Sequence, residues 1–546
     1  MDPKTEAFPK LTAAQIGRAR SYATHRRVAA GEIVFEVGDS RVPMFILVSG
    51  AMEIVQPLEK GERPVALHGA GEFTGETNMI SGRRSLVRGR VTAAGEFIEI
   101  SPENLRSLIS RDAELSEIFM RAFILRRLVL IAKGFGDVVL LGSRHSAGTL
   151  RLREFLARNG HPFTYVDLDT DPQSQEILDR FNVSVADVPV LVCRGTTVLR
   201  NPSPQAVADC LGLNNPVDES QVRDVVIVGA GPAGLAAAVY AASEGLNALV
   251  IETNAPGGQA GSSSKIENYL GFPVGVSGSE LAARALNQAQ KFGAQMMIAH
   301  SVDRLHCGRR PYQIELDNGQ KLTARTIVIA TGAQYNKPAI PNLAKFEGLG
   351  VYYGATFLEA QLCEQEEVIV VGGGNSAGQA AVYLSQTARH VHILVRSGQL
   401  SDTMSRYLIQ RIEENPNISL HYHTEITALE GEDHLERVQW RDKLSGTAET
   451  RPIRHVFLMT GAVPNTAWLQ NCLALDSKGF ILTGHDLQAG GKSLWTGSRP
   501  PYLLETSIPG VFAVGDVRSE NVKRVASAVG EGSISVHLVH RVLAEG

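Results

Sequence analysis

The chain has 546 residues, of which 44% are hydrophobic and 20% are charged. At roughly 100–200 residues per domain this length corresponds to about three or four domains, and the composition is not that of a disordered protein. Lysine and arginine number 53 and aspartate and glutamate 57, which gives a net charge of −4 without a polybasic block. Small molecules are therefore better candidate partners than nucleic acid or anionic lipid.

The N-terminal residues carry no apolar signal core, and no uninterrupted apolar run of about 18 residues occurs, so we expect a cytoplasmic protein without a membrane partner. The five cysteines include no CxxC pair, so neither a zinc ribbon nor a local redox disulfide can form from them. The alternating histidines of HVHIL and ISLHYHTEI lack further ligands nearby, and we expect no metal site. The cysteines are Cys193, Cys210, Cys307, Cys363 and Cys472.

Residues 1–135 are predicted to form a small antiparallel β-roll closed by a helix. Short segments of alternating hydrophobicity are separated by glycine-centred turns, which is typical of such a roll. A helix is expected within Pro102–Lys133, with Ser101 as its N-cap. The alternating segments are Glu32–Val37, Met44–Val48, Met52–Gln56 and Phe97–Ile100.

Residues 136–213 follow a βαβαββα pattern, from the strand DVVLLGS to the helix PQAVADCLG, and residues 214–221 then read as a linker. The pattern resembles a glutaredoxin or thioredoxin domain, with Val188-Pro189 where that fold carries its cis-proline. The resemblance implies two cysteines at the start of the first helix. Ser146 and Thr149 occupy those positions here.

Residues 222–546 alternate buried strands with helices, which implies parallel sheets built from βαβ units. The first unit holds Gly229, Gly231 and Gly234 in G-x-G-x-x-G spacing, and its second strand ends at Glu252. The glycines permit a tight turn and close approach of amides to a pyrophosphate, and the carboxylate can accept a hydrogen bond from a ribose hydroxyl. A dinucleotide site is therefore predicted.

A second unit holds Gly372, Gly374 and Ala377 in the related G-x-G-x-x-A spacing. Its second strand is expected to end at Arg396 instead of an acid. A guanidinium suits a 2′-phosphate, so the pattern favours NADPH over NADH, unless Arg396 is an ordinary surface residue.

Further motifs appear in the order of the low-molecular-weight thioredoxin reductase family, which residues 222–546 resemble throughout. They are PGGQA, ENYLGFP, IVIATGA, MTGAVPN, TSIPGVFAVGDV and KRVASAVGEG. The resemblance implies an FAD-binding domain over 222–338 and 465–546, and an NAD(P)H-binding domain over 339–464. The implied FAD residues are Gly229, Gly231, Pro232, Ala233, Gly234, Glu252, Gly258, Gln259, Asn268, Thr331, Gly332, Gly515, Asp516, Val525 and Ala526. The implied NADPH residues are Gly372, Gly374, Asn375, Ser376, Ala377 and Arg396.

The family pattern fails at its redox-active disulfide. Where the resemblance implies Cys-Ala-Thr-Cys-Asp, this chain has the sequence GATFL, so Gly354 and Phe357 replace the sulfurs. Disulfide exchange requires a thiolate, so we predict that a flavin here does not reduce a disulfide by the family route. Gln379 and Ser397 also depart from the family's NADPH pattern, which leaves NADH open.

The N-terminal segment GEFTGETNMISGRRSLVRGRV resembles the phosphate-binding cassette of cyclic-nucleotide-binding domains. The resemblance implies that Gly75, Glu76, Arg84 and Ser85 bind the ligand, with Glu76 on the ribose hydroxyl and Arg84 on the cyclic phosphate. Leu86 and an extra arginine before Arg84 depart from the pattern. The alternative is a degenerate β-roll used for dimerisation or domain docking.

These observations predict a cyclic-nucleotide-responsive FAD-dependent oxidoreductase, homodimeric by resemblance. NAD(P)H would supply the electrons, and a quinone, a ferredoxin-like carrier or oxygen would accept them. The effector would be cAMP or cGMP. The alternative is a flavin and cyclic-nucleotide sensor or docking protein with vestigial turnover. Thioredoxin reduction through Cys363 is disfavoured because no second thiol lies near it in the sequence.

Overall fold

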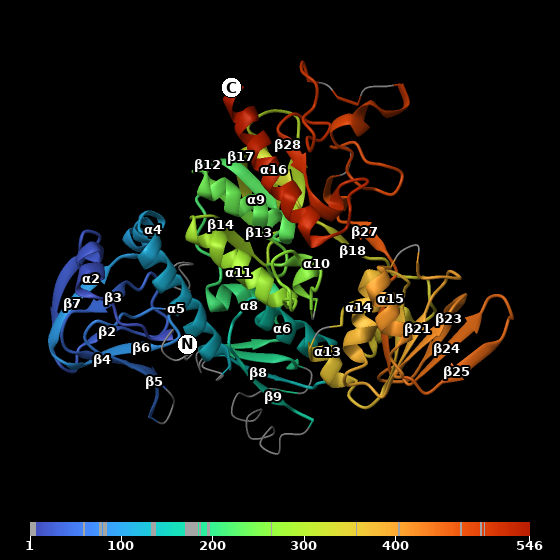
Figure 1. Cartoon of the computed structure of the whole chain (residues 1–546), viewed down its shortest axis with the longest axis horizontal. Helices are drawn as coiled ribbons and strands as arrows, with labels where there is room; N and C mark the ends of the chain where they lie inside the picture. The colour runs from blue at the N-terminus through green and yellow to red at the C-terminus, as the bar shows by residue number, and fades with distance from the viewer. Residues whose placement is uncertain are drawn as a thin grey trace.

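The chain folds into four groups of helices and strands. The computed structural model describes residues 7–57, 61–75, 79, 84–132, 138–169, 184, 187–193, 197–263, 265–355, 357–401, 404–469, 472–491, 494–495 and 497–545. Figure 1 shows the N-terminal group in blue on one side and the yellow and orange group on the other. Between them lies a green and red central group, with a teal group below it.

The predicted N-terminal β-roll is confirmed. Two antiparallel sheets, of strand orders β1-β7-β3 and β2-β6-β4-β5, enclose a core that includes Phe45, Phe73 and Phe97. The elements are α2 (Ala13–Arg20), β1 (Thr24–Val28), β2 (Ile33–Phe35), β3 (Met44–Leu47), β4 (Ala51–Pro57), β5 (Glu62–His68), β6 (Arg88–Ala93) and β7 (Gly95–Ile100).

The roll is closed by two helices where the sequence predicted one, α4 (Pro102–Arg111) and α5 (Ala113–Ala132). Ser101 is the N-cap of α4 as predicted, because its side chain accepts from the amide of Asn104 at 3.2 Å. Asp112 has an extended backbone, and its Oδ1 accepts from the amide of Leu115 at 3.0 Å. The single-helix expectation is wrong because Asp112 ends α4 and caps α5.

The middle group is a four-stranded sheet of order β11-β10-β8-β9, in which only β8 and β9 are parallel. The described elements match the predicted ones, and the Val188-Pro189 peptide bond is cis. The predicted helix PQSQEILDRF lies outside the described residues. The elements are β8 (Val138–Gly142), α6 (Ala147–Arg158), β9 (Thr164–Asp167), β10 (Val190–Cys193), β11 (Thr197–Arg200) and α8 (Pro204–Leu211).

The central group contains a sheet of order β14-β13-β12-β17-β16-β15, with β28 added beside β17. The prediction of a parallel sheet holds for β14, β13, β12, β17 and β28, but is wrong for β15 and β16, which pair antiparallel. Helices α9 and α16 pack against each other over it (Figure 1). The elements are β12 (Val222–Val228), α9 (Pro232–Ser243), β13 (Ala248–Glu252), α10 (Gly258–Gly261), α11 (Gly278–Lys291), β14 (Gln295–Ile298), β15 (Val302–His306), β16 (Tyr312–Leu316), β17 (Lys321–Ile329), η3 (Gly484–Gly491), β28 (Val511–Ala513), η4 (Gly515–Val517) and α16 (Val525–Ala544).

The fourth group holds the second predicted parallel sheet, β19-β26-β20-β21-β22, and a small antiparallel sheet, β23-β24-β25. The antiparallel pair β18 (Ala333–Tyr335) and β27 (Ala462–Pro464) joins it to the central group. The elements are α12 (Leu343–Phe346), β19 (Val351–Tyr352), α13 (Phe357–Leu362), β20 (Glu367–Val371), α14 (Asn375–Leu384), β21 (His390–Leu394), α15 (Arg406–Glu413), β22 (Ile418–His421), β23 (Thr424–Glu430), β24 (Arg437–Asp442), β25 (Ala448–Arg451) and β26 (His455–Leu458).

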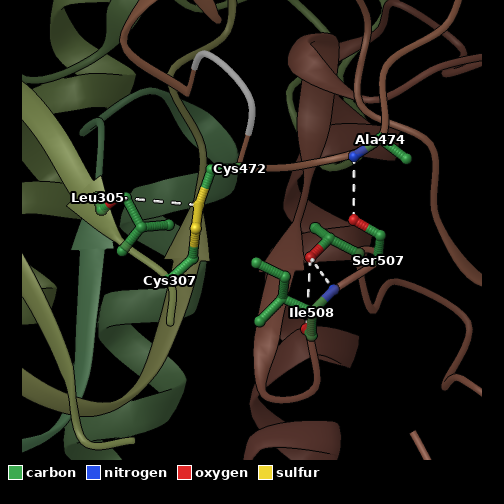
Figure 2. Close-up of a disulfide and its surroundings, with 7 residues drawn as sticks. Leu305, Cys307, Cys472, Ala474, Ser507 and Ile508 are labelled. Atoms are coloured by element: carbon green, nitrogen blue, oxygen red, sulfur yellow. Dashed lines mark hydrogen bonds between the residues drawn. A yellow bond between two sulfur atoms is a disulfide. The ribbon is translucent and has the colours of Figure 1, made fainter. Parts of the chain in front are cut away.

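A disulfide joins Cys307, just after β15, to Cys472, which follows η2 (Ala467–Leu469), with 6.1 Å between their Cα atoms (Figure 2). The sequence excluded only a local pair, and these cysteines are 165 positions apart, so no spacing pattern indicates their pairing. Within the described part of the chain, no helix is both long and apolar enough to cross a membrane.

Two buried histidines of the fourth group make its stability depend on pH. Burial lowers the pKa of His392, on β21, and of His455, on β26, to about 4 each. In the unfolded chain both titrate near 6.5, so the unfolded state binds more protons as the pH falls below that value. The folded state is therefore destabilised on acidification, between about pH 6.5 and pH 4.

We expect the free energy of unfolding of this group to fall by about 2 kcal/mol per histidine between pH 7.5 and pH 5. Chemical denaturation at the two pH values measures the change, and His392→Asn should reduce it. His485 is exposed, so His485→Asn serves as the control and should leave it unchanged. A transition midpoint that does not move with pH would contradict the assignment.

Candidate functional site

The first glycine fingerprint forms the predicted tight turn between β12 and α9. Gly229 has a φ of 102°, and Gly231 caps α9. A Cβ atom on Gly234 would lie 1.9 Å from the carbonyl oxygen of Gly229, so only glycine fits there. By contrast, a Cβ on Gly231 would meet nothing closer than the Gly258 Cα at 3.9 Å. The backbone therefore fills the space next to Gly234, whereas the space next to Gly231, towards α10, is open.

Glu252 holds this turn from the end of β13. Its carboxylate accepts from the amide of Ala230 at 2.7 Å and from the amide of Asn254 at 3.0 Å. Burial raises the pKa of Glu252. The predicted acid therefore lies directly beside the glycine turn, where a ribose would be bound.

A second acid comes from residues 465–546, the second part of the predicted FAD-binding domain. Asp516 lies in η4, near the end of the motif TSIPGVFAVGDV, and burial raises its pKa. Among the described residues, none donates a hydrogen bond to its carboxylate, which leaves both oxygens available for a polyol. Helix α16 begins at Val525, as predicted, and Ala526 follows in its first turn.

Thr331 and Asn465 link the two halves of the central group. The Thr331 hydroxyl donates to the Asn465 carbonyl oxygen, and the Asn465 amide donates to the Thr331 carbonyl oxygen, both at 2.9 Å. Gly332 has a φ of 63°, with open space where a side chain would stand. Asn268 is exposed, away from the buried residues of the fingerprint. The residues expected to hold FAD thus form an open cradle, with acids at two points and no side chain filling the glycine turn.

The second fingerprint caps α14 with Gly374. Asn375 Oδ1 accepts from the amide of Ser405 at 2.8 Å, and Ala377 is buried in the core of this group. Strand β21 ends at Leu394, two residues before the predicted Arg396, whose side chain is exposed.

A cavity of about 430 Å³ lies between the second fingerprint on α14 and the segment of α10. Ser376 and Gln379 line it from α14, and Gln259 lines it from α10. Gly354 also lies on this cavity, with its Cβ position 4.0 Å from the Cβ of Ser262. The segment where the resemblance implies a disulfide is therefore next to the expected flavin segment.

Cys363 is a protonated thiol at neutral pH. It is fully buried, and burial raises its pKa to about 12. Its sulfur donates to the carbonyl oxygens of Glu359 and Ala360. It is therefore poorly suited to thiolate chemistry.

The described cassette residues of the N-terminal roll do not converge on one point. Gly75 packs beneath Phe123 of α5, and the Ser85 hydroxyl donates to the Val87 carbonyl oxygen at 2.8 Å. Arg84 reaches out of the roll, because a Cβ on Gly212 would lie 2.9 Å from its Nε. Gly212 ends α8 of the middle group in a left-handed conformation. Glu76 lies outside the described residues.

Sequence reasoning missed two adjacent arginines on α5. Arg126 is buried, and it donates to the carbonyl oxygens of Phe73 and Gly75 at 3.0 Å each. Burial lowers its pKa to about 9. Arg127 donates to the carbonyl oxygen of Gly160, just beyond α6, at 2.5 Å. Because the acceptors are backbone atoms, no residue pattern signals these contacts.

The C-terminal end of α6 continues these contacts to the central group. Arg158 donates to the Gly258 carbonyl oxygen at 2.8 Å, and Asn159 donates to the Asn254 carbonyl oxygen at 3.3 Å. Contacts therefore run from the N-terminal cassette through α5 and α6 to the segment entering α10.

Comparisons with known proteins agree with this arrangement. Residues 223–532 match the family model described as Pyridine nucleotide-disulphide oxidoreductase, and residues 25–112 match the model described as Cyclic nucleotide-binding domain. The chain is 33% identical over 316 residues to the thioredoxin reductase of Ureaplasma parvum serovar 3 (strain ATCC 700970), covering 58% of this chain and 95% of that protein. It is 31% identical over 366 residues to NADPH-dependent thioredoxin reductase 3 of Arabidopsis thaliana, covering 64% of this chain and 65% of that protein.

Solved structures give the same result. The crystal structure of Lactococcus lactis thioredoxin reductase in the FR conformation has a TM-score of 0.53 and 27% sequence identity, covering 59% of this chain and 100% of that chain. The thioredoxin reductase of T. acidophilum has a TM-score of 0.53 and 28% identity, covering 59% and 99%.

Replacement of Gly234 tests the first fingerprint. Gly234→Ala places a methyl group against the Gly229 carbonyl, so the turn must open. We expect the purified variant to lose most of its flavin absorbance relative to protein absorbance. Gly17→Ala, on α2 of the N-terminal roll, is the control because nothing lies within 4 Å of the added atom, and it should keep its flavin. Equal flavin content in both variants would contradict the assignment.

Proposed function

Because the chain belongs to the pyridine nucleotide-disulphide oxidoreductase family, we propose that it is an FAD-dependent NAD(P)H oxidoreductase with a non-disulfide acceptor. A quinone, a ferredoxin-like carrier or oxygen would accept the electrons, and a cyclic nucleotide would regulate the rate. One observation carries the proposal. The second fingerprint, at Ser376, and the segment around Gln259 line one cavity, while Gly354 stands on its wall at a position where the resemblance implies sulfur.

The chain's own residues fit FAD. Glu252 would accept from the adenosine ribose, and Asp516 would accept from the polyol chain. The first amides of α9 and α16 would face the pyrophosphate and the flavin ring, respectively. FAD, when bound, supplies the ring that accepts a hydride and that can pass electrons to an acceptor one or two at a time.

The second fingerprint would bind NAD(P)H as substrate. The first amides of α14 face the position of a pyrophosphate beyond Gly374. Arg396 is exposed and carries the charge that a 2′-phosphate requires. The proposal therefore favours NADPH over NADH.

Loss of sulfur supports a non-disulfide acceptor. Gly354 carries no nucleophile, and the buried Cys363 has its pKa raised to about 12. In the middle group, which we propose is thioredoxin-like, Ser146 is the N-cap of α6 and accepts from the amide of Thr149 at 3.4 Å. Neither residue can exchange with a disulfide.

A cyclic nucleotide would act through Arg84 and α5. A cyclic phosphate in the roll would compete with the C-terminal end of α8 for the Arg84 guanidinium. Movement of the cassette at Gly75 would be transmitted by Arg126 and Arg127 to the end of α6. The contacts of Arg158 then reach the segment entering α10.

An anaerobic titration tests the proposal. The FAD-loaded protein is mixed with NADPH and then with NADH, with and without cAMP and cGMP, while the visible flavin absorbance is followed. We expect bleaching, faster with NADPH, and no reduction of a disulfide dye after bleaching. A flavin that stays oxidised under all conditions would overturn the proposal and favour a sensor in which FAD is a conformational ligand.

Arg127→Ala tests how the nucleotide signal passes between groups. The variant removes the bond to the Gly160 carbonyl and leaves the cassette residues in place. We expect the change in reduction rate caused by the nucleotide, about 5–150-fold for ordinary coupling energies, to shrink towards none. Nucleotide binding, measured by calorimetry, should persist. Glu117→Ala, at an exposed position of α5, is the control. A full response in Arg127→Ala would contradict this route.

A further inference from the structure

The cavity between α10 and α14 has a third wall, which comes from neither the central group nor the fourth group. One face of α6, from the middle group, contributes Ala147, Leu150, Arg151, Glu154 and Arg158 to its lining. These positions follow the helical period, so a single helix face spans the cavity.

Packing fixes this wall on both sides. Leu150 packs against the hydrophobic core of the fourth group. A Cβ atom on Gly348 of that group would lie 3.0 Å from the Cβ of Ala147, so the two backbones approach closely. On the other side, Arg158 donates to the Gly258 carbonyl oxygen at 2.8 Å. Helix α6 therefore contacts both the fourth group and the central group, which form the other walls of the cavity.

The cavity is lined by four cations, Arg151, Arg158, Lys265 and Lys337, and by two carboxylates, Glu154 and Glu359. Arg158 pairs with Glu154 at 3.2 Å. Lys265 pairs with Glu267 at 3.3 Å, and Lys337 pairs with Glu347 at 2.7 Å. Arg151 differs, because no carboxylate in the described parts of the chain pairs with it. An exposed guanidinium that lines a cavity without a protein counter-ion can form charge-assisted bonds to phosphate oxygens.

The positions of Ser376 and Arg396 indicate which phosphate group of a dinucleotide would lie near Arg151. Ser376, on the same cavity, is the second residue of α14, where the helix N-terminus faces a pyrophosphate. Arg396 follows β21, whereas α14 follows β20, so Arg396 lies at the end of another strand. Its guanidinium suits the 2′-phosphate. Ser376, Gln259 and the α6 face line the same cavity, so a dinucleotide bound there would lie beside α6.

We propose that α6 is a structural wall of the nicotinamide site and that Arg151 binds the pyrophosphate of NAD(P)H opposite the α14 N-terminus. The proposal rests on the proposed function, because it takes NAD(P)H as the occupant of the cavity. It assigns the middle group a binding role that requires no cysteine. Arg151 would then strengthen the binding of NADPH and NADH equally, because the two share the pyrophosphate. It would not distinguish one from the other.

Equilibrium binding of NADP⁺ and NAD⁺ to the full-length, FAD-loaded protein tests this assignment, with flavin fluorescence or calorimetry as the readout. Arg151→Ala should weaken both ligands by the same factor, about tenfold, because it removes one charge-assisted contact to a shared group. Arg151→Lys should recover part of the loss. Arg396→Ala should weaken NADP⁺ alone.

Arg153→Ala is the matched control on the same helix, since that guanidinium lies over the Tyr165 ring at 4.3 Å and does not line the cavity. It should leave both affinities unchanged, and thermal unfolding confirms that each variant is folded. Unchanged binding in folded Arg151→Ala, a loss confined to NADP⁺, or an equal loss in Arg153→Ala would overturn the proposal. If the unmodified protein binds neither nucleotide, the proposed function fails as well, which distinguishes the two failures.

Discussion

Hydrogen bonds from the end of α6 to the segment entering α10 determine how the parts of this chain are arranged. Arg158 and Asn159 donate to the carbonyl oxygens of Gly258 and Asn254. These bonds are partly buried, and each such bond contributes about 0.5–1.5 kcal/mol. They hold α6 against α10 at one end of the cavity, and the contacts of Arg127 continue from the same end of α6 to the N-terminal roll.

Two segments where the sequence resemblances imply cysteines have regular local structure without them. Ser146 still begins α6 as its N-cap, and Gly354 still faces the segment around Ser262. Both sites lack sulfur, and the nearby Cys363 is buried and protonated. Helix α6 packs against the fourth group through Ala147 and Leu150, and neither contact needs a cysteine, which is why we assign α6 a binding role.

Local patterns predicted most of the fold, because glycine spacing and strand alternation are properties of neighbouring residues. The turn at Gly229, the Ser101 cap and the start of α16 at Val525 are all of this kind. The break at Asp112 was missed because the apolar pattern continues across it. The contacts of Arg127 and the Cys307–Cys472 bond were not predictable, because their partners are distant and, for Arg127, a backbone oxygen.

Gly212 shows how two constraints can meet at one residue. It ends α8 with a φ of 62°, and the guanidinium of Arg84 lies where its side chain would be. A mutation there would appear to be a fault in the middle group, although the residue it displaces belongs to the N-terminal roll. If the proposed regulation holds, a genetic screen for altered regulation would recover such an allele outside the N-terminal roll. Sequence change at this glycine is limited both by its own backbone and by an arginine more than a hundred positions away.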